Sequence, residues 1–300
     1  MRAVSPNGQP VLILGGSGYI GRHLYAKTGP EGARGTYCRH PFGGGSYFDA
    51  LTMRVSDIVA PSESFSCAFV LLGDTKPDSC ARNVERARRL NVECVIAIID
   101  QLRDRGIVPV FTSSEVVFDG EKGGYVESDA VRPLMVYGAQ KVEVEDYLRK
   151  NVPEHLIVRC ARVVGVEPGD GTLFTSWMEP IARGENLRCA TDHVFSAIHV
   201  DDVIRALLCL VQIGARGTFH VAGPEGLSRV EMLRRLIACY RRWCPTTATV
   251  TGCRMRDFVT LEPRPRDVSL RPDKLVAATG LRIRTVSECL EDVVENWLAR

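Results

Sequence analysis

The sequence predicts an α/β fold, a doubly wound parallel sheet with helices on both faces and a smaller C-terminal domain beside it. Three observations support this prediction. Short apolar runs alternate with longer amphipathic stretches, which is typical of parallel sheets. The first apolar run passes through a glycine-rich turn directly into a helical pattern. After about residue 222 the alternation loosens, and two helical stretches flank the Pro/Arg-rich connection EPRPRDVSLRP.

The individual elements follow from these patterns. The strand-like runs are Val11–Leu14, Gly35–Cys38, Cys67–Leu72, Ile107–Phe111, Leu156–Arg159 and Gly217–Val221. Helical patterns lie near 19–28, 53–60, 82–105, 134–150, 201–213, 228–242 and 287–299. The segment 165–190 is rich in Gly and Pro and reads, like the C-terminal tail, as part of the second domain. We therefore expect residues 1–164 plus 191–222 to form one domain and residues 165–190 plus 223–300 the smaller one.

The composition is that of an ordinary soluble globular protein. Hydrophobic residues make up 45% and charged residues 25% of the chain. A net charge of +2 gives no reason to expect nucleic acid or a membrane surface as a partner. No apolar run reaches the roughly 18 residues of a membrane-spanning helix, and the first residues lack the apolar segment of a signal peptide. The 11 cysteines are scattered, mostly inside apolar runs, so we expect reduced thiols, a cytoplasmic protein and no metal site.

The segment VLILGGSGYIGRHL combines an apolar strand, a glycine turn and the start of a helix. Gly15, Gly18 and Gly21 are spaced as GxxGxxG. The first two glycines let the backbone turn tightly and approach a pyrophosphate at the helix N-terminus, and the third lets helix and strand pack closely. Because the turn follows the first strand of the chain and opens a helix, we predict nucleotide binding here.

The residues after the second strand bear on the choice of dinucleotide. An acidic residue there would bind the ribose 2′-hydroxyl of NAD, but the sequence reads GARGTYCRHPF, with Arg39 near the expected position. An arginine suits a 2′-phosphate, so NADP is favoured over NAD. Asp49 lies where a carboxylate could bind the adenine; a helix N-cap is an equally good interpretation.

A tyrosine and a lysine lie one helical turn apart on the face that should be buried. Tyr137, Lys141, Val144 and Leu148 follow the spacing of a single helical face. A lysine cation near a tyrosine favours the phenolate and lowers the phenol pKa from about 10, which suits a proton-transfer catalyst. A simpler interpretation, with Lys141 reaching solvent and Tyr137 in the core, stays open. Ser114 ends a predicted strand at the edge where α/β sites form, so its hydroxyl could hold a substrate carbonyl.

These residues resemble the extended branch of the short-chain dehydrogenase/reductases. The segments GGSGYIG, SSEVVFDG, YGAQK, AIHVDDVIRALL and RPRDVSLRPDKL carry the resemblance over nearly the whole chain. The last four are most similar to the family of dTDP-4-dehydrorhamnose reductase. The resemblance implies a Rossmann fold, an NAD(P)H cofactor, and catalytic roles for Ser114, Tyr137 and Lys141, with Asn91 as a structural asparagine.

Further site positions follow from the glycine turn and this resemblance together. Substrate contacts are predicted for Ser114, Glu115 and Arg266. Cofactor contacts are predicted for Gly15, Ser17, Gly18, Tyr19, Ile20, Gly21, Arg39, Asp49, Ala50, Leu72, Tyr137 and Lys141. The chain departs from the reductase pattern in LLGDTKP, at Val116, and in RCARVVG, which lacks the tryptophan and tyrosine common there.

The predicted reaction is the NADPH-dependent reduction of a keto group on a nucleotide-activated deoxy sugar. The related 4,6-dehydratases carry Thr-Asp-Glu, but here the triplet is Ser114-Glu115-Val116, so elimination lacks its second carboxylate. A sugar-nucleotide epimerase stays open, as does a non-catalytic NADP-binding regulatory subunit like the beta subunit of methionine adenosyltransferase. The sequence also leaves the oligomeric state open, a homodimer included.

His199 is interpreted as part of a strand–helix junction with Asp201 as the N-cap.

Overall fold

The computed structural model describes residues 8–300, and its centre is a parallel sheet of seven strands. The strands follow the order β11-β6-β5-β4-β1-β2-β3. Their bounds are β1 Val11–Leu14, β2 Ala33–Tyr37, β3 Ser46–Tyr47, β4 Cys67–Val70, β5 Val108–Ser114, β6 Leu156–Cys160 and β11 Gly217–Val221. All six neighbouring pairs are parallel. This is the doubly wound Rossmann order, so the predicted fold class is confirmed.

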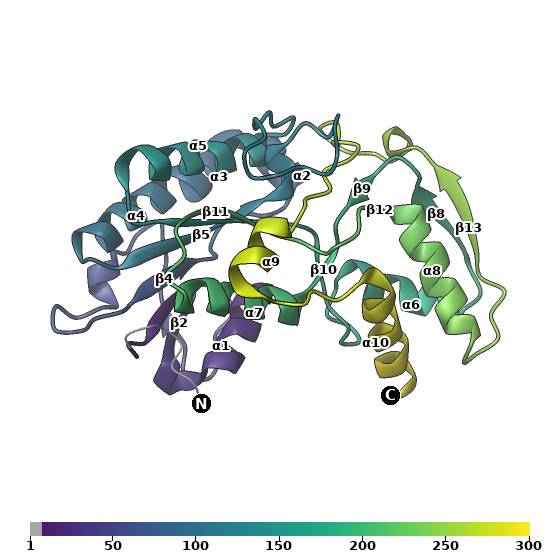
Figure 1. The fold of residues 1–300 in the computed structure, drawn as a ribbon, viewed down its shortest axis with the longest axis horizontal. Helices are drawn as coiled ribbons and strands as arrows, with labels where there is room; N and C mark the ends of the chain where they lie inside the picture. Colours follow the sequence, from purple (N-terminus) through teal and green to yellow (C-terminus); the bar gives the residue numbers. More distant parts are fainter. Residues whose placement is uncertain (1–7) are drawn as a thin grey trace.

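Helices cover both faces of this sheet because side chains of a strand point alternately to opposite faces. In β1, Val11 and Ile13 join one core cluster and Leu12 and Leu14 join another. The first face is covered by α1 (Tyr19–Gly32), α7 (Val200–Gln212) and α9 (Asp273–Thr279), and the second by α4 (Cys94–Asp104) and α5 (Val136–Asn151). Figure 1 shows these two helical layers above and below the sheet.

A second core lies beside the sheet. It is built from α6 (Leu173–Ala182), α8 (Arg229–Arg241) and α10 (Val286–Leu298), with the parallel pair β8 (Asn186–Ala190) and β13 (Thr249–Cys253). Short strands lie between the two cores: β7 Val163–Val164 pairs with β10 Ile198–His199, and β9 Val194–Phe195 pairs with β12 Leu227–Ser228. Figure 1 shows this part to the right of the sheet. The division at residues 164, 190 and 222 stays a prediction.

Three predicted segments differ from the structure. Residues 53–60 hold only the 3-10 turn Val55–Asp57, because burying Val55 and Val59 needs one turn and Pro61 follows. The stretch 82–105 is divided into α2 (Pro77–Arg82), α3 (Val84–Arg88), the π-helical turn Arg89–Glu93 and α4. The Gly/Pro-rich segment 165–190 contains α6 and β8, whose core residues were hidden among the turn residues.

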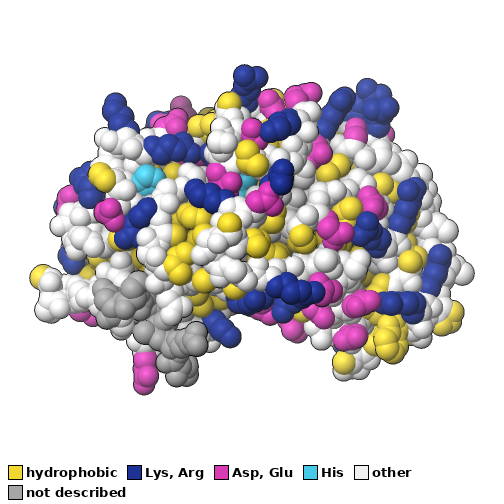
Figure 2. Space-filling model, viewed as in Figure 1, with side chains coloured by type: hydrophobic (Ala, Val, Ile, Leu, Met, Phe, Trp, Pro, Cys, Tyr) yellow, Lys and Arg dark blue, Asp and Glu magenta, His cyan; other side chains and the backbone are white. Residues whose placement is uncertain are grey.

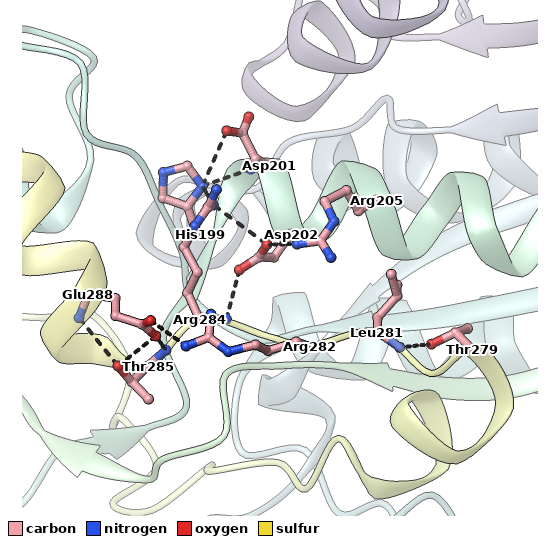
Figure 3. Close-up of polar contacts among 10 residues, drawn as sticks. All are labelled: His199, Asp201, Asp202, Arg205, Thr279, Leu281, Arg282, Arg284, Thr285 and Glu288. Atoms are coloured by element: carbon pink, nitrogen blue, oxygen red, sulfur yellow. Dashed lines mark hydrogen bonds and ion pairs between the residues drawn. The ribbon is translucent and has the colours of Figure 1, made fainter. Parts of the chain in front are cut away.

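The chain crosses from the sheet to the second core between α9 and α10, and polar contacts fix this crossing. Asp202, fully buried in the first turn of α7, accepts hydrogen bonds from Arg284 N (3.0 Å) and from the Arg205 guanidinium (2.8 Å). Arg284 also donates to His199 Nδ1 at 2.7 Å. Figure 3 shows these side chains converging where α7 begins. We call Asp202, Arg284 and His199 the crossing contact.

The cap of α7 differs from the prediction. The N-cap is His199, whose Nδ1 accepts a hydrogen bond from Asp201 N at 3.0 Å, while Asp201 belongs to the first turn of the helix. The prediction of Asp201 as N-cap is therefore wrong by two positions, because an imidazole took the capping role that carboxylates commonly fill. The structural junction at His199 is present as expected.

The surface carries both signs of charge. Figure 2 shows basic and acidic side chains interspersed over the face it presents, in keeping with a net charge of +2. Within residues 8–300, no helix is both long enough and apolar enough to cross a membrane. Over the same residues all 11 cysteines are free thiols, and six of them are buried.

Candidate active site

The glycine turn is held in place by the second strand. Thr36 on β2 is buried, and its hydroxyl accepts a hydrogen bond from Gly15 N at 3.0 Å. Its carbonyl accepts from Ser17 N at 3.3 Å, and Gly18 N donates to Gly15 O at 3.0 Å. The turn between β1 and α1 is therefore fixed before any ligand binds, with the start of α1 available to an anion.

The third glycine of the turn is required by close packing. A Cβ on Gly21 would lie 2.2 Å from Gly15 O, a distance that no side chain tolerates. Any larger residue would push α1 away from the turn, as the sequence predicted for this position. Gly15 also approaches the loop after β4, since its own Cβ would lie 3.0 Å from Leu72 N. The glycine turn and Leu72 thus form one continuous backbone surface. Tyr19 and Ile20 begin α1 at this surface, both partly exposed.

The end of β2 has the character expected from the sequence. Arg39 follows the strand by two residues and is exposed. In the described part of the chain, no acidic group lies within ion-pair distance of its guanidinium. Asp49 does not begin a helix: its Oδ1 accepts a hydrogen bond from Leu51 N at 3.0 Å and closes a turn that contains Ala50. The N-cap interpretation of Asp49 is wrong, and the adenine contact stays a prediction.

Tyr137 and Lys141 are both buried on the inner face of α5, with 8% and 6% of their surfaces exposed. The Lys141 ammonium donates to the carbonyl of Thr112 at 2.8 Å. It lies 4.6 Å from the centre of the Phe111 ring and 5.6 Å from that of Tyr137. Burial lowers the pKa of Lys141 to about 8. The simpler interpretation, in which this lysine reaches solvent, is therefore wrong.

The electrostatics of Tyr137 differ from the prediction. Burial raises the pKa of the phenol well above its ordinary value, and the nearby charge that lowers it comes from Arg162. The expectation that Lys141 by itself shifts the tyrosine toward the phenolate is corrected, because loss of hydration outweighs the attraction of the neighbouring cation. The phenol therefore keeps its proton at neutral pH, which is the form a proton donor needs.

Ser114 is brought to Tyr137 by a direct contact between two backbone segments. Ser114 ends β5, and its hydroxyl accepts a hydrogen bond from Val116 N at 3.4 Å. The carbonyl of Val116 lies so close to α5 that a Cβ on Gly138 would be 2.3 Å from it. Val116 also packs against the cluster that contains Tyr137. Residues 114–116 and the first turn of α5 therefore form one unit at the carboxyl edge of the sheet.

Glu115 is buried behind Ser114, with 4% of its surface exposed. Its Oε2 accepts a hydrogen bond from Arg162 N at 2.8 Å. Burial raises the pKa of this carboxyl to about 7, so it titrates near neutrality. Arg266 is exposed, and its carbonyl accepts from Val194 N at 2.7 Å. Arg264, the other arginine of PRPRD, is instead paired with Asp78 at 2.7 Å.

Two features of the site were not predicted. The hydroxyl of Tyr19 donates to Asp170 Oδ2 at 3.1 Å, which ties the loop after β7 to the start of α1. These residues are 151 positions apart in the sequence, and no local sequence pattern predicts their contact. The carbonyl of Thr112 was also missed, because a backbone acceptor leaves no trace in residue type. The buried Asn91, expected as structural, bonds Gln140 Oε1 (2.8 Å) beside Lys141 and accepts from Asp74 N (2.7 Å).

Comparison with known proteins identifies the family. A family model described as the RmlD substrate binding domain matches residues 9–298. The chain belongs to this family. It is accordingly an NAD(P)-dependent oxidoreductase of the extended short-chain dehydrogenase/reductase type, as the sequence resemblance indicated.

Three relatives illustrate the range of this RmlD family. The dTDP-4-dehydrorhamnose reductase of Aggregatibacter actinomycetemcomitans is 24% identical over 305 residues, covering 94% of this chain and 97% of that protein. Methionine adenosyltransferase 2 subunit beta of Danio rerio is 25% identical over 232 residues, covering 74% and 71%. A probable low-salt glycan biosynthesis reductase of Haloferax volcanii is 31% identical over 158 residues, 51% of this chain and about half (53%) of that relative's length.

Solved structures show the same fold. The dTDP-4-dehydrorhamnose reductase of Bacillus anthracis in complex with NADP aligns with a TM-score of 0.79 at 19% identity, covering 97% of this chain and 99% of that one. The UDP-glucose 4-epimerase of Thermotoga maritima with UDP-glucose has the same score and identity, with coverage of 97% and 99%. Reductase and epimerase therefore share this architecture, and the site residues must distinguish them.

Proposed function

We propose that this RmlD-family protein reduces a keto group on a nucleotide-activated deoxy sugar with NADPH. The observation that carries the proposal is the unit formed by Ser114, Tyr137 and Lys141 at the carboxyl edge of the sheet. A proton donor, a hydroxyl that can hold a carbonyl and a buried cation are all that carbonyl reduction requires from the protein. Since free cysteines suit a reducing compartment, we place the reaction in the cytosol.

The residues present fit a dinucleotide. The backbone from Gly15 to Gly21 turns so tightly that a Cβ on Gly15 or Gly21 would meet neighbouring backbone atoms, and the turn presents the start of α1 to a pyrophosphate. Exposed Arg39 is positioned to pair with a 2′-phosphate, which favours NADP over NAD. When bound, the nicotinamide cofactor supplies the hydride. Ser17, Tyr19, Ile20, Ala50 and Leu72 are the further positions at which we expect contact with it.

The side chains divide the remaining work. Ser114 donates a hydrogen bond to the substrate carbonyl, and Tyr137 gives its proton to the developing alkoxide. The phenolate left behind is stabilised by the Lys141 ammonium, whose position is fixed by the Thr112 carbonyl (2.8 Å). Burial keeps Tyr137 protonated until the substrate oxygen gains charge. Glu115 and Arg266 are proposed to contact the substrate beside this centre.

An epimerase and a non-catalytic NADP-binding subunit remain as alternatives, the second favoured by the similarity to methionine adenosyltransferase 2 subunit beta. The direct test is NADPH oxidation with a panel of 4-keto nucleotide sugars, for wild type and for Tyr137→Phe. Turnover should fall by about 10²–10⁴-fold in the variant while NADPH affinity is kept. Tight NADPH binding without turnover on any substrate would favour the regulatory subunit. Interconversion of C4-epimeric nucleotide sugars with the oxidised cofactor, and without net change in the cofactor, would favour the epimerase.

A further inference from the structure

Two arginines and a histidine meet beside the catalytic unit. Arg162 lies two residues after the end of β6, and its backbone N–H donates to Glu115 Oε2 at 2.8 Å. Its guanidinium lies 5.8 Å from the centre of the Phe195 ring, which contacts the His193 ring at 5.4 Å. Arg229 begins α8, and its backbone N–H donates to His193 O at 3.0 Å. We call Arg162, Arg229 and His193 the cationic cluster.

Among residues 8–300, the side chains of this cluster have no hydrogen-bond or ion-pair partner. In the described chain, no acidic side chain lies within ion-pair distance of Arg162 or Arg229, whereas Arg235, also on α8, pairs with both Glu225 and Glu231. Arg229 Nε is buried without a hydrogen-bond partner, and so is Nδ1 of His193, a residue with 8% of its surface exposed. Buried polar groups are normally satisfied, so these atoms point to a ligand that supplies acceptors.

The charges of the cluster disfavour one another in the absence of an anion. Burial, Arg229 and Arg162 together lower the pKa of His193 to about 3, with Arg264 adding to the effect, so the ring is neutral. Burial lowers the pKa of Arg229, and Arg162 acts in the same direction. An oxyanion between the two guanidinium groups would offset this repulsion and make charge-assisted hydrogen bonds with both.

We propose that the cationic cluster is a substrate subsite for an oxyanion next to the reacting carbonyl. The inference rests on the proposed function and narrows it, because it requires a substrate with a phosphate or carboxylate close to the keto group. The hydrogen bond from Arg162 N to the side chain of Glu115 joins the cluster to the residue that follows Ser114. The same segment, RCARVVG, is one of those in which the chain departs from the reductase pattern.

Equilibrium binding of small anions tests the subsite without relying on turnover. Pyrophosphate and malonate would be titrated into NADPH-saturated protein by calorimetry, so that the cofactor's own pyrophosphate occupies the glycine turn. Wild type should bind at least one of them, and Arg162→Met and Arg229→Met should each weaken that binding by about ten- to hundredfold. Arg234→Met is the matched control, since Arg234 is exposed on the same helix, and should bind as wild type does.

The two probes distinguish the source of the anion. Preference for pyrophosphate indicates the diphosphate of a nucleotide sugar, and preference for malonate indicates a carboxylate on the sugar. Thermal melting of each variant shows whether it is folded, and the single variant Arg229→Lys should keep part of the affinity that Arg229→Met loses if charge is what matters. The subsite is disproved if wild type binds neither anion, or if Arg234→Met loses as much affinity as the cluster variants. If wild type binds an anion at this subsite but oxidises no NADPH with any keto sugar, only the proposed reaction is refuted.

Discussion

At the scale of single residues, Lys141 shows a conflict between stability and chemistry. Its ammonium is buried against Phe111 and makes one hydrogen bond, to Thr112 O. One acceptor does not replace the water lost on burial, so the pKa falls to about 8. The chain therefore keeps an ammonium group where burial disfavours it. This charge would stabilise the phenolate that forms when Tyr137 donates its proton.

Replacing this lysine should stabilise the fold while it damages catalysis. Lys141→Met should raise the free energy of unfolding by about 1–3 kcal/mol at pH 7. The unfolded lysine titrates near 10.5 and the folded one near 8, so the folded state binds fewer protons between these values and wild type gains stability as pH rises through them. The advantage of Lys141→Met should therefore disappear by about pH 10. Urea denaturation at pH 7 and pH 10 measures it, and a variant less stable than wild type at pH 7 would contradict the argument.

Arg39 allows a second test at this scale. We expect Arg39→Ala to weaken NADPH binding by about ten- to hundredfold and to leave NADH binding unchanged, because one ion pair to a 2′-phosphate contributes about 1.5–3 kcal/mol. Fluorescence titration with both cofactors measures this preference. Lys27, exposed on α1, provides the control variant Lys27→Ala, which should bind both cofactors as wild type does. Equal affinities of wild type for NADPH and NADH would remove the role assigned to Arg39.

At the scale of elements, local patterns predicted most of what local forces determine. Buried strands such as β1 and β4 appear in the sequence as uninterrupted apolar runs, and α5 appears through its four-residue spacing. Tyr137 and Lys141 were found for the same reason, since one helical turn joins them. A helix was wrongly predicted for residues 53–60 because Val55 and Val59 also have helical spacing. Only a 3-10 turn forms there.

The contact between α5 and the turn after β5 is the element-scale feature most open to test. Gly138→Ala should lower stability by about 1–3 kcal/mol, although alanine is the better helix former, because its Cβ would meet Val116 O at 2.3 Å. Separating Ser114 from Tyr137 by about 1 Å should cut turnover by about a hundredfold. Ala139→Gly, at the exposed neighbouring position, should lose about 1 kcal/mol from helix propensity alone and keep its turnover. If both variants lose turnover equally, the backbone contact does not position the site.

At the scale of the whole molecule, sequence patterns gave less guidance. The parallel direction of the strands follows from the alternation of strands and helices, because parallel connections need crossover helices, whereas the strand order and the short edge strand β3 were not predicted. The links between the sheet and the second core do not follow from it. Tyr19–Asp170, Glu115–Arg162 and Asp202–Arg284 each join residues distant in the chain, and their residue types are those of any polar surface. Such contacts become visible only after the fold has brought the segments together.

The crossing contact should contribute to the stability of the molecule as a whole. Asp202 is fully buried and holds both the backbone N–H and the guanidinium of Arg284. Asp202→Ala therefore leaves the Arg284 N–H without its acceptor, and leaves the guanidinium with His199 Nδ1 but without its anionic partner, at the start of the segment that leads into α10. We expect a loss of about 3 kcal/mol. In guanidinium denaturation this should lower the transition midpoint with an unchanged slope, because the slope depends on the surface exposed by unfolding. The control is Arg205→Met, which removes only the exposed partner of the same carboxylate (42% of its side chain exposed) and should cost less than about 1 kcal/mol. If both variants lose the same free energy of unfolding, Asp202 stabilises only α7, and its contact with Arg284 does not stabilise the crossing between the two cores.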